Sequence, residues 1–514
     1  MKMTVQKPKN LAELSKDELL QIIEKLTIQN NRLNHYLFGS RSERFVGDFV
    51  GQALLFNEPE ELVEVEDKAV NDPKDDKTGS PKPRGKRKPL PPHLPRVENI
   101  VDLPDDQKKC KVHDVDLEKI GEERVEKLVI VPAKALVSVD IVLKYKCPCC
   151  ETNIVEATRA PDPIPKSFAS PGLLAYIAIQ KYEDHLPLAR QEKIFQRVDI
   201  DLDRTTMARW MIRCKELSEP LLNLMHDDLI NSPIIHADET TIQVLNEPNK
   251  TAQSKSYIWC LARNTDEPIV LYRYYDSRGR KAAEDLLLDY GGTVICDGYK
   301  VYESLRKTLS FTLAGCWAHV RRRFWEAEKF GKKSRLGDEL SSATQGLQFI
   351  DSLYSIEKEV KSLGDEQILA ARQGRSTLIL EEFLDWLEKK SLTILPRSPT
   401  GKAIHYALGQ WSKLQEFARD ARIAIDNNFL ESQIKHLAVG RKNWVFASVQ
   451  AGAHASAGLY SLIATAKANG IDPFDYLSLI FKELPAATTH EKLESLLPYN
   501  ARQSYQLRSY QPKK

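Results

Sequence analysis

The spacing of apolar residues changes along the chain and predicts its elements in turn. Residues 11–37 carry apolar side chains that alternate by four and three positions, the a/d seam of a coiled coil: Leu19, Ile23, Leu26, Leu33 and Leu37, with Asn30 at an a position. We therefore expect a self-associating helix within residues 1–45. The alternative is an amphipathic helix that packs on its own protein.

The next two hundred residues predict three further regions. Residues 46–98 have no periodicity and are rich in proline and charge, which indicates a linker. Residues 99–155 predict a small, strand-rich unit. Residues 156–228 predict helices, and 190–214 contain a helix-turn-helix in which Asp203 caps the start of the second helix.

From residue 229 the pattern becomes that of a mixed sheet. IIHADETTIQVL, KSYIWCLAR and PIVLYRYY predict three strands, which a helix (281–289) and the strand GTVICDGY follow. This order opens an RNase H-like fold, to which we assign residues 229–330 and 421–472. Residues 331–420 predict a helical insertion. The tail, 473–514, predicts some helix and a polar, mobile end.

The composition indicates the general class of protein. The 514 residues are 42% hydrophobic and 28% charged, which is typical of a globular protein of several domains. The net charge of +2 averages an acidic block at 58–67 and a basic block at 82–88. No apolar leader and no run near the roughly 18 residues needed to span a bilayer is visible. We expect a soluble, cytoplasmic protein without a membrane partner.

Three carboxylates stand at informative places. Asp238 follows an apolar strand start, Asp297 closes another apolar strand, and Glu431 lies on a helix that Asp426 is placed to cap. Carboxylates that meet at one point can hold the two ions, about 3.5–4 Å apart, used in phosphoryl transfer. Lys435, one turn after Glu431, could meet a DNA phosphate. On spacing alone, these acids are equally read as turn and surface residues.

Four of the eight cysteines cluster, whereas the others are scattered, which does not indicate a disulfide framework. Cys110 and His113, followed by Cys147 and Cys150, have the spacing of two zinc knuckles. We expect a structural Zn²⁺ site; the alternative is a degenerate finger that folds without metal. Cys149 is a surplus thiol that could compete with Cys150.

Several short sequence motifs along the chain resemble those of a known protein family. HADET, CDGY, GCWAHVRRRF, IDNN and GRKNWVFA, with PIPKSFASPGLLAYIAIQKYEDHLPLARQE, closely resemble the insertion-sequence-66 family of transposases from about residue 37 to 473. The resemblance implies an RNase H-like core whose DDE triad is Asp238, Asp297 and Glu431. It also implies Mg²⁺- or Mn²⁺-dependent cleavage at element ends and strand transfer by a 3′-hydroxyl.

The chain departs from the family around the third acid. The family often has Ala-Ala after the paired asparagines and Arg after the Glu, whereas this chain has Phe429, Leu430 and Ser432 there, and Lys435 replaces a frequent Arg. The three carboxylates themselves are unchanged. The departures therefore bear on DNA contacts near Glu431 rather than on the chemistry.

Basic segments supply the candidate DNA contacts. PRGKRKP resembles an AT-hook core that could enter the minor groove, the helix-turn-helix could read a major groove, and two basic-aromatic clusters could hold phosphates or stack on bases. For each of these candidates the alternative to DNA binding is a solvated basic segment or a packed side chain. The candidates are Arg84, Lys86, Arg204, Thr206, Arg209, His319, Arg322, Lys435, Arg441, Lys442 and Trp444.

Taken together, these patterns predict a multidomain α+β protein. An RNase H-like core, a mixed sheet flanked by helices, carries the helical insertion and follows a coiled-coil helix, a zinc unit and a helix-turn-helix region. We expect a nucleoid-associated bacterial transposase that acts as a homo-oligomer on double-stranded DNA, with small accessory proteins as further candidate partners. The rivals are an inactive DNA-binding regulator and an RNase H-like nuclease that cuts without joining.

Overall fold

The computed structural model describes residues 135–146, 154–156, 159–265, 267–332 and 341–510. The expected coiled coil, the AT-hook-like segment with Arg84 and Lys86, and the expected zinc ligands Cys110, His113, Cys147 and Cys150 lie outside the described residues. They stay predictions. The described residues belong to two compact units, one ending at Ala157 and one beginning at Thr158.

The first unit contains a short antiparallel pair of strands. β1 (Lys144–Lys146) pairs with β2 (Ile154–Glu156), with Tyr145 opposite Val155. In the sequence, the segment with Cys147 and Cys150 lies between these strands.

The second unit opens with four helices: α3 (Pro171–Tyr182), α4 (Leu188–Gln196), α5 (Arg204–Leu217) and α6 (Glu219–Ile230). α4 and α5 are joined by a short turn at the place where the apolar pattern predicts a helix-turn-helix. Asp203 caps α5, since its side chain accepts hydrogen bonds from the backbone N–H groups of Thr205 at 2.8 Å and Thr206 at 3.0 Å. The predicted cap is therefore confirmed.

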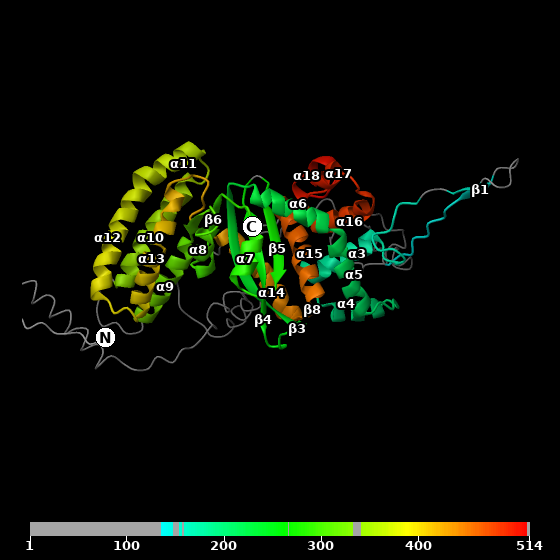
Figure 1. Cartoon of the computed structure of the whole chain (residues 1–514), viewed down its shortest axis with the longest axis horizontal. Coiled ribbons are helices and arrows are strands. Elements are labelled where there is room, and N and C mark those ends of the chain that lie inside the picture. Colours follow the sequence, from blue (N-terminus) through cyan, green and yellow to red (C-terminus); the bar gives the residue numbers. More distant parts are fainter. Residues whose placement is uncertain (1–134, 147–153, 157–158, 266, 333–340, 511–514) are drawn as a thin grey trace, which may run out of the picture. The chain divides into compact units, whose positions relative to one another are not determined.

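A mixed sheet forms the centre of this unit (Figure 1). Its main path runs β5-β4-β3-β6-β7, and β8 also pairs with β3. β3 to β5 are antiparallel neighbours, whereas β6 and β7 are parallel to β3. Their bounds are β3 (Ile234–Asn246), β4 (Lys255–Arg263), β5 (Ile269–Tyr275), β6 (Thr293–Cys296), β7 (Thr312–Gly315) and β8 (Ala447–Val449). Three antiparallel strands followed by two parallel ones fit the RNase H-like core that the sequence predicts.

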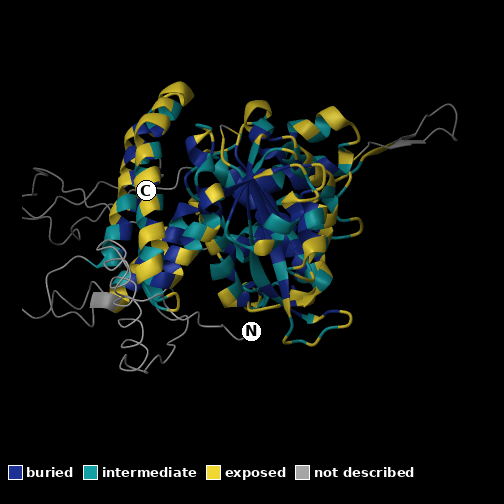
Figure 2. Cartoon of the chain, turned by 60° about the vertical axis from the view of Figure 1, so that its left-hand side comes forward, coloured by how far each residue is buried: buried dark blue, intermediate teal, exposed yellow. Residues whose placement is uncertain are grey.

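Helices connect the strands and cover the sheet. α7 (Arg280–Leu286) and α8 (Lys300–Arg306) join β5 to β7, and α9 (Trp317–Lys332), α14 (Asn428–Trp444) and α15 (Gln450–Ala468) complete the core. Figure 2 shows buried residues concentrated on the strands. The edge strand β5 is protected by α15: Ser461 accepts from the N–H of Tyr272 at 2.8 Å, and Thr465 accepts from that of Val270 at 3.0 Å. This satisfies donors that an open edge would offer to another chain.

The predicted insertion is a set of helices between α9 and α14. They are α10 (Ser342–Val360), α11 (Asp365–Ala371), a π-helical turn (Arg372–Ser376), α12 (Thr377–Thr393) and α13 (Pro399–Leu414), followed by a 3₁₀ turn (Glu416–Ala418). They have an apolar core of their own, in which Trp317 of α9 packs against Phe383 and Trp411. Trp317 also donates to the carbonyl of Leu414 at 2.9 Å, so α9 joins the insertion to the sheet.

The tail is partly helical. It forms α16 (Pro473–Glu483), a 3₁₀ turn (Leu484–Ala486), α17 (His490–Ser495) and α18 (Pro498–Ser504), and Tyr476 and Phe481 are fully buried. Arg508 binds both carboxylate oxygens of Asp475. The helix expected in the tail is therefore confirmed, and the mobility of its polar end stays a prediction.

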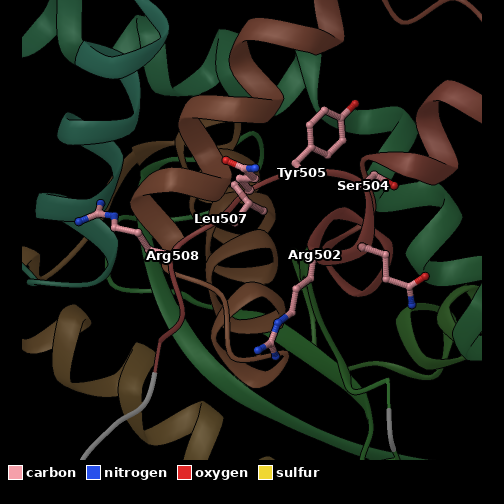
Figure 3. A pocket seen from close by; sticks show the side chains of 7 residues that line it. Arg502, Ser504, Tyr505, Leu507 and Arg508 are labelled. Carbon is pink, nitrogen blue, oxygen red and sulfur yellow. The ribbon is translucent and has the colours of Figure 1, made fainter.

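Residues 502–508 also line a surface hollow (Figure 3). It contains none of the three predicted catalytic acids, so we do not place the candidate active site there. Among the described residues, no helix is long and apolar enough to cross a membrane.

Candidate active site

Asp238 and Asp297 lie on neighbouring parallel strands. In the β3–β6 register Ile234 faces Thr293 and His236 faces Ile295. Continuing this register by two residues places Asp238 beside Asp297, on strands about 4.8 Å apart. Asp238 accepts from the N–H of Glu239 at 2.8 Å, and Asp297 accepts from that of Tyr299 at 2.8 Å. Asp297 directly follows β6, as expected, whereas Asp238 lies inside the long strand β3 rather than at its end.

Glu431 reaches the same place from a helix that is fixed to β3 at its first turn. Asn427 precedes α14 and is fully buried; its side-chain oxygen lies 2.7 Å from Nδ1 of His236, and its N–H₂ donates to the carbonyl of Ala237 at 3.4 Å. Glu431 lies one turn further on, and its N–H donates to the carbonyl of Asn427 at 3.0 Å. The helix that carries Glu431 is therefore attached to the strand just before Asp238.

Asp426 completes the start of α14. Its carboxylate accepts from the backbone N–H of Asn428, the first residue of the helix, at 3.0 Å, although the N-cap position itself is occupied by Asn427. The same carboxylate accepts from the hydroxyl of Tyr354, on α10, at 2.7 Å. The sequence analysis did not identify this second contact, which links the insertion to the Glu431 helix.

The carboxyl group of Asp238 is influenced by the other acids. Burial, and after it the negative charges of Glu239, Asp297 and Glu431, together raise the pKa of Asp238 to about 8. One carboxylate oxygen of Glu431 is buried without a hydrogen-bond partner. An excess of negative charge with unused oxygen atoms is the environment that a cation would stabilise.

His319 and Arg322, both on α9, face Glu431. Nδ1 of His319 lies 3.5 Å from one carboxylate oxygen, and the guanidinium of Arg322 donates to the other at 3.2 Å. Burial lowers the pKa of His319, while the charges of Glu431 and Asp297 oppose that effect. These contacts place α9 beside the acids and orient Glu431 from the side opposite β3's attachment point.

The donor set fits a hard divalent ion. Three carboxylates offer the oxygen ligands that Mg²⁺ prefers. Among the described residues, the possible ligand atoms that all lie within 4.8 Å of one another belong instead to a softer combination, Cys316, His319 and Glu431. However, Cys316 is buried, which raises its pKa to about 12, and its sulfur accepts from the N–H of Asn427 at 3.3 Å. We therefore favour the carboxylate set.

Glu239, the neighbour of Asp238, belongs to a buried ion pair that the sequence analysis missed. Arg278 binds its carboxylate, and Tyr302 donates to the other oxygen at 3.2 Å. The guanidinium of Arg278 stacks 3.8 Å from the ring centre of Tyr299. Little in the sequence indicates this ion pair, because Arg278 lies 39 residues from Glu239. The sign that was available is that Glu239 and Tyr299 lie in the HADET and CDGY motifs of the candidate catalytic acids.

The basic-aromatic cluster at the end of α14 has a largely internal setting. Arg441 donates to the hydroxyls of Thr240 and Thr241, each at 3.1 Å, and also to the carbonyl of Thr241. Trp444 is buried in the main core, whereas Lys435 and Lys442 are exposed. For Trp444 the structure thus favours the packed alternative, whereas the two lysines present their side chains to solvent.

The helix-turn-helix residues lie on the surface. Arg204 and Arg209 are exposed at the beginning of α5, while the hydroxyl of Thr206 donates to Asp203 at 2.7 Å. This position is compatible with a recognition helix, and the direct DNA contact stays a prediction.

The fold defines a transposase-like core, and comparisons with known proteins identify the family. The model of the "Transposase IS66 family" matches residues 166–455, that of the "IS66 C-terminal element" matches 461–499, and "Transposase C of IS166 homeodomain" matches 25–98. The chain belongs to the IS66 family of transposases.

Two relatives from Sinorhizobium fredii (strain NBRC 101917 / NGR234) match over most of their length. The uncharacterized protein y4qI is 32% identical over 90% of this chain and 86% of its own. The uncharacterized protein y4hP is 29% identical over 92% of this chain and 88% of its own.

Proposed function

We propose that this chain is a DDE transposase that cleaves DNA at insertion-sequence ends and joins the freed ends to target DNA. The observation that supports the proposal is that the charges of Asp297 and Glu431 both act on the carboxyl group of Asp238. The three acids lie in β3, directly after β6 and on α14, up to 193 positions apart along the chain. Buried acids are costly to gather unless they bind a cation.

The residues have distinct roles in this proposal. Asp238, Asp297 and Glu431 would hold two divalent ions, Mg²⁺ or Mn²⁺, which would activate the attacking oxygen and stabilise the leaving oxygen. His319 and Arg322 orient Glu431, and the half-exposed guanidinium of Arg322 also faces the side from which a phosphate would approach. Arg209 and its neighbours on α5 would hold flanking double-stranded DNA.

A cleavage assay tests the proposal. Full-length protein is incubated with a plasmid that carries both element ends, in Mg²⁺ or Mn²⁺, and nicks and joined products are mapped. We expect Asp238→Asn, Asp297→Asn and Glu431→Gln each to abolish nicking while DNA binding persists. Asp351→Asn is the matched control, because Asp351 is an exposed acid paired with Arg321 on the insertion side of α9.

The same assay separates the rival functions. Nicks without joined products would favour an RNase H-like nuclease, and binding without nicks would favour a regulator. Persistent nicking by an amide variant would contradict the site assignment.

The amino-terminal predictions extend the proposal. A structural Zn²⁺ held by Cys110, His113, Cys147 and Cys150, a DNA-binding segment with Arg84 and Lys86, and a self-associating helix at 11–37 are the expected accessory parts. Metal analysis of the purified chain tests the first: one zinc per chain is expected, and Cys110→Ser should lower that content. Zinc content unchanged by that substitution would contradict the ligand assignment.

A further inference from the structure

Three consecutive arginines on α9 have three different environments. Arg321 donates to Asp351 at 2.8 Å, and Arg322 donates to Glu431 at 3.2 Å. Arg323 instead lies over the ring of Tyr406, with its guanidinium carbon 4.0 Å from the ring centre. Among the residues that the structure describes, no acidic side chain forms an ion pair with Arg323, and this arginine is exposed. Its N–H donors therefore remain available to a ligand.

Tyr406 places this arginine next to the active site. The ring, on α13, lies against Gly298, the residue after Asp297; a Cβ added at Gly298 would lie 3.1 Å from both Cε2 and the hydroxyl oxygen of Tyr406. Burial raises the pKa of Tyr406 to about 12, and the charges of Arg323 and Asp297 both act on its hydroxyl. The stacked pair and the catalytic carboxylate are thus neighbours.

We infer that Arg323, held by Tyr406, is a phosphate-binding subsite for the DNA strand at the active site. The inference rests on the proposed function and adds a substrate contact to it. A guanidinium stays charged and presents coplanar donors that match two phosphate oxygens. Stacking on an aromatic ring fixes the plane of the guanidinium without using those donors. Tyr354 and Asp426 give the insertion a second contact with the site, so the insertion forms one wall of it.

The occupant is a DNA phosphate rather than a protein carboxylate for an electrostatic reason. The adjacent cluster of acids repels free anions, so an anion binds there only when other contacts, or ions held by the acids, offset that repulsion. A DNA strand provides many such contacts along its backbone, including those expected from α5.

Binding measurements test the subsite without relying on cleavage. Full-length protein is titrated with element-end DNA and with a scrambled duplex, in Ca²⁺, at several salt concentrations. Arg323→Ala should weaken binding of both duplexes by about tenfold and reduce the slope of log K against log salt by about one, as expected for a lost phosphate contact. Arg323→Lys should have a smaller effect, since charge remains but the planar fork does not.

Matched variants distinguish the effect of positioning Arg323 on the Tyr406 ring from the effect of its charge. Tyr406→Leu should weaken binding less than Arg323→Ala, and Tyr406→Phe should bind as the wild type does, because the ring remains. Arg321→Ala, which removes the same charge from a paired arginine, should change affinity by less than about twofold. Unchanged affinity and salt slope in Arg323→Ala, or an equal loss in Arg321→Ala, would overturn the inference. Neither result depends on whether the protein nicks DNA, so failure of the proposed function remains separately visible.

Discussion

Two basic-aromatic clusters look alike in the sequence and differ in the fold. The α9 cluster comprises His319, Arg321, Arg322 and Arg323; the α14 cluster comprises Arg441, Lys442 and Trp444. Two arginines of the α9 cluster face the acids or an adjacent ring with exposed guanidinium groups. In the α14 cluster, Arg441 is bonded to β3, and Trp444 belongs to the core.

The difference shows that the partners of an arginine, rather than the composition around it, decide whether it can hold DNA. Arg441 stabilises the attachment of the Glu431 helix to the strand that carries Asp238. Arg322 and Arg323 lie where a substrate could reach them. We therefore expect substitutions of Arg441 and Trp444 to act mainly on stability, and those of Arg323 mainly on DNA binding.

The largest expected effect is that of Trp444→Ala. Removing a buried indole leaves a cavity in the core and should lower the free energy of unfolding by about 3–5 kcal/mol. Denaturant unfolding measures the loss of stability. DNA-binding titrations, corrected for the fraction of folded protein, should give an affinity close to that of the wild type. A stable variant with weak DNA binding would mean that Trp444 contacts DNA after all.

Arg441→Met should have the next largest effect. The substitution leaves the Thr241 carbonyl and the two threonine hydroxyls without their shared donor, which costs about 1–3 kcal/mol when these groups are partly buried. Thermal or denaturant unfolding provides the measurement. We expect little change in the salt dependence of DNA binding, and a slope reduced by about one would place Arg441 on a phosphate instead.

Gly298→Ala tests the other cluster. The added methyl group would lie 3.1 Å from the Tyr406 ring and 3.2 Å from the side-chain nitrogen of Gln410, so the ring must shift. We expect a modest stability loss of about 1 kcal/mol and a DNA-binding defect like that of Tyr406→Leu. Wild-type affinity would indicate that the placement of Tyr406 does not control Arg323.

A last test is the pH dependence of stability at Lys181, a residue of α3 that lies beside the α14 cluster. The ammonium of Lys181 lies 5.5 Å from the ring centre of Trp444, and burial lowers its pKa to about 8. The unfolded chain, with a lysine pKa near 10.4, then binds more protons between those values, so the free energy of unfolding should rise with pH from about 8 to 10.4. Lys181→Met should flatten that rise; an equal rise in both proteins would contradict the assignment.

The core was predictable because its signals are local. Apolar runs predict the strands, and the two acids, Asp238 within β3 and Asp297 directly after β6, stand next to such runs in the sequence. The start of α14 was likewise visible from Asp426. These features need only neighbouring residues, which a single sequence provides.

The rest depends on partners that are distant in the sequence. His236 and Asn427 are 191 positions apart, and Arg441 and Thr241 are 200 apart. Nothing local distinguishes Arg323, which stacks on the insertion, from Arg321, which pairs with an acid. The tail is a further case, since Arg508 binds Asp475, which lies 33 positions away in the sequence.

The account depends on three acids acting as one ion-binding site. Calorimetric titration of Mn²⁺ into the full-length protein and into Asp238→Asn, Asp297→Asn and Glu431→Gln tests this most directly, with Asp351→Asn as control. We predict that each of the three variants weakens Mn²⁺ binding at least about tenfold and that the control binds as the wild type does. Unchanged Mn²⁺ affinity in any one of the three would show that its carboxylate is not a ligand and would contradict the triad.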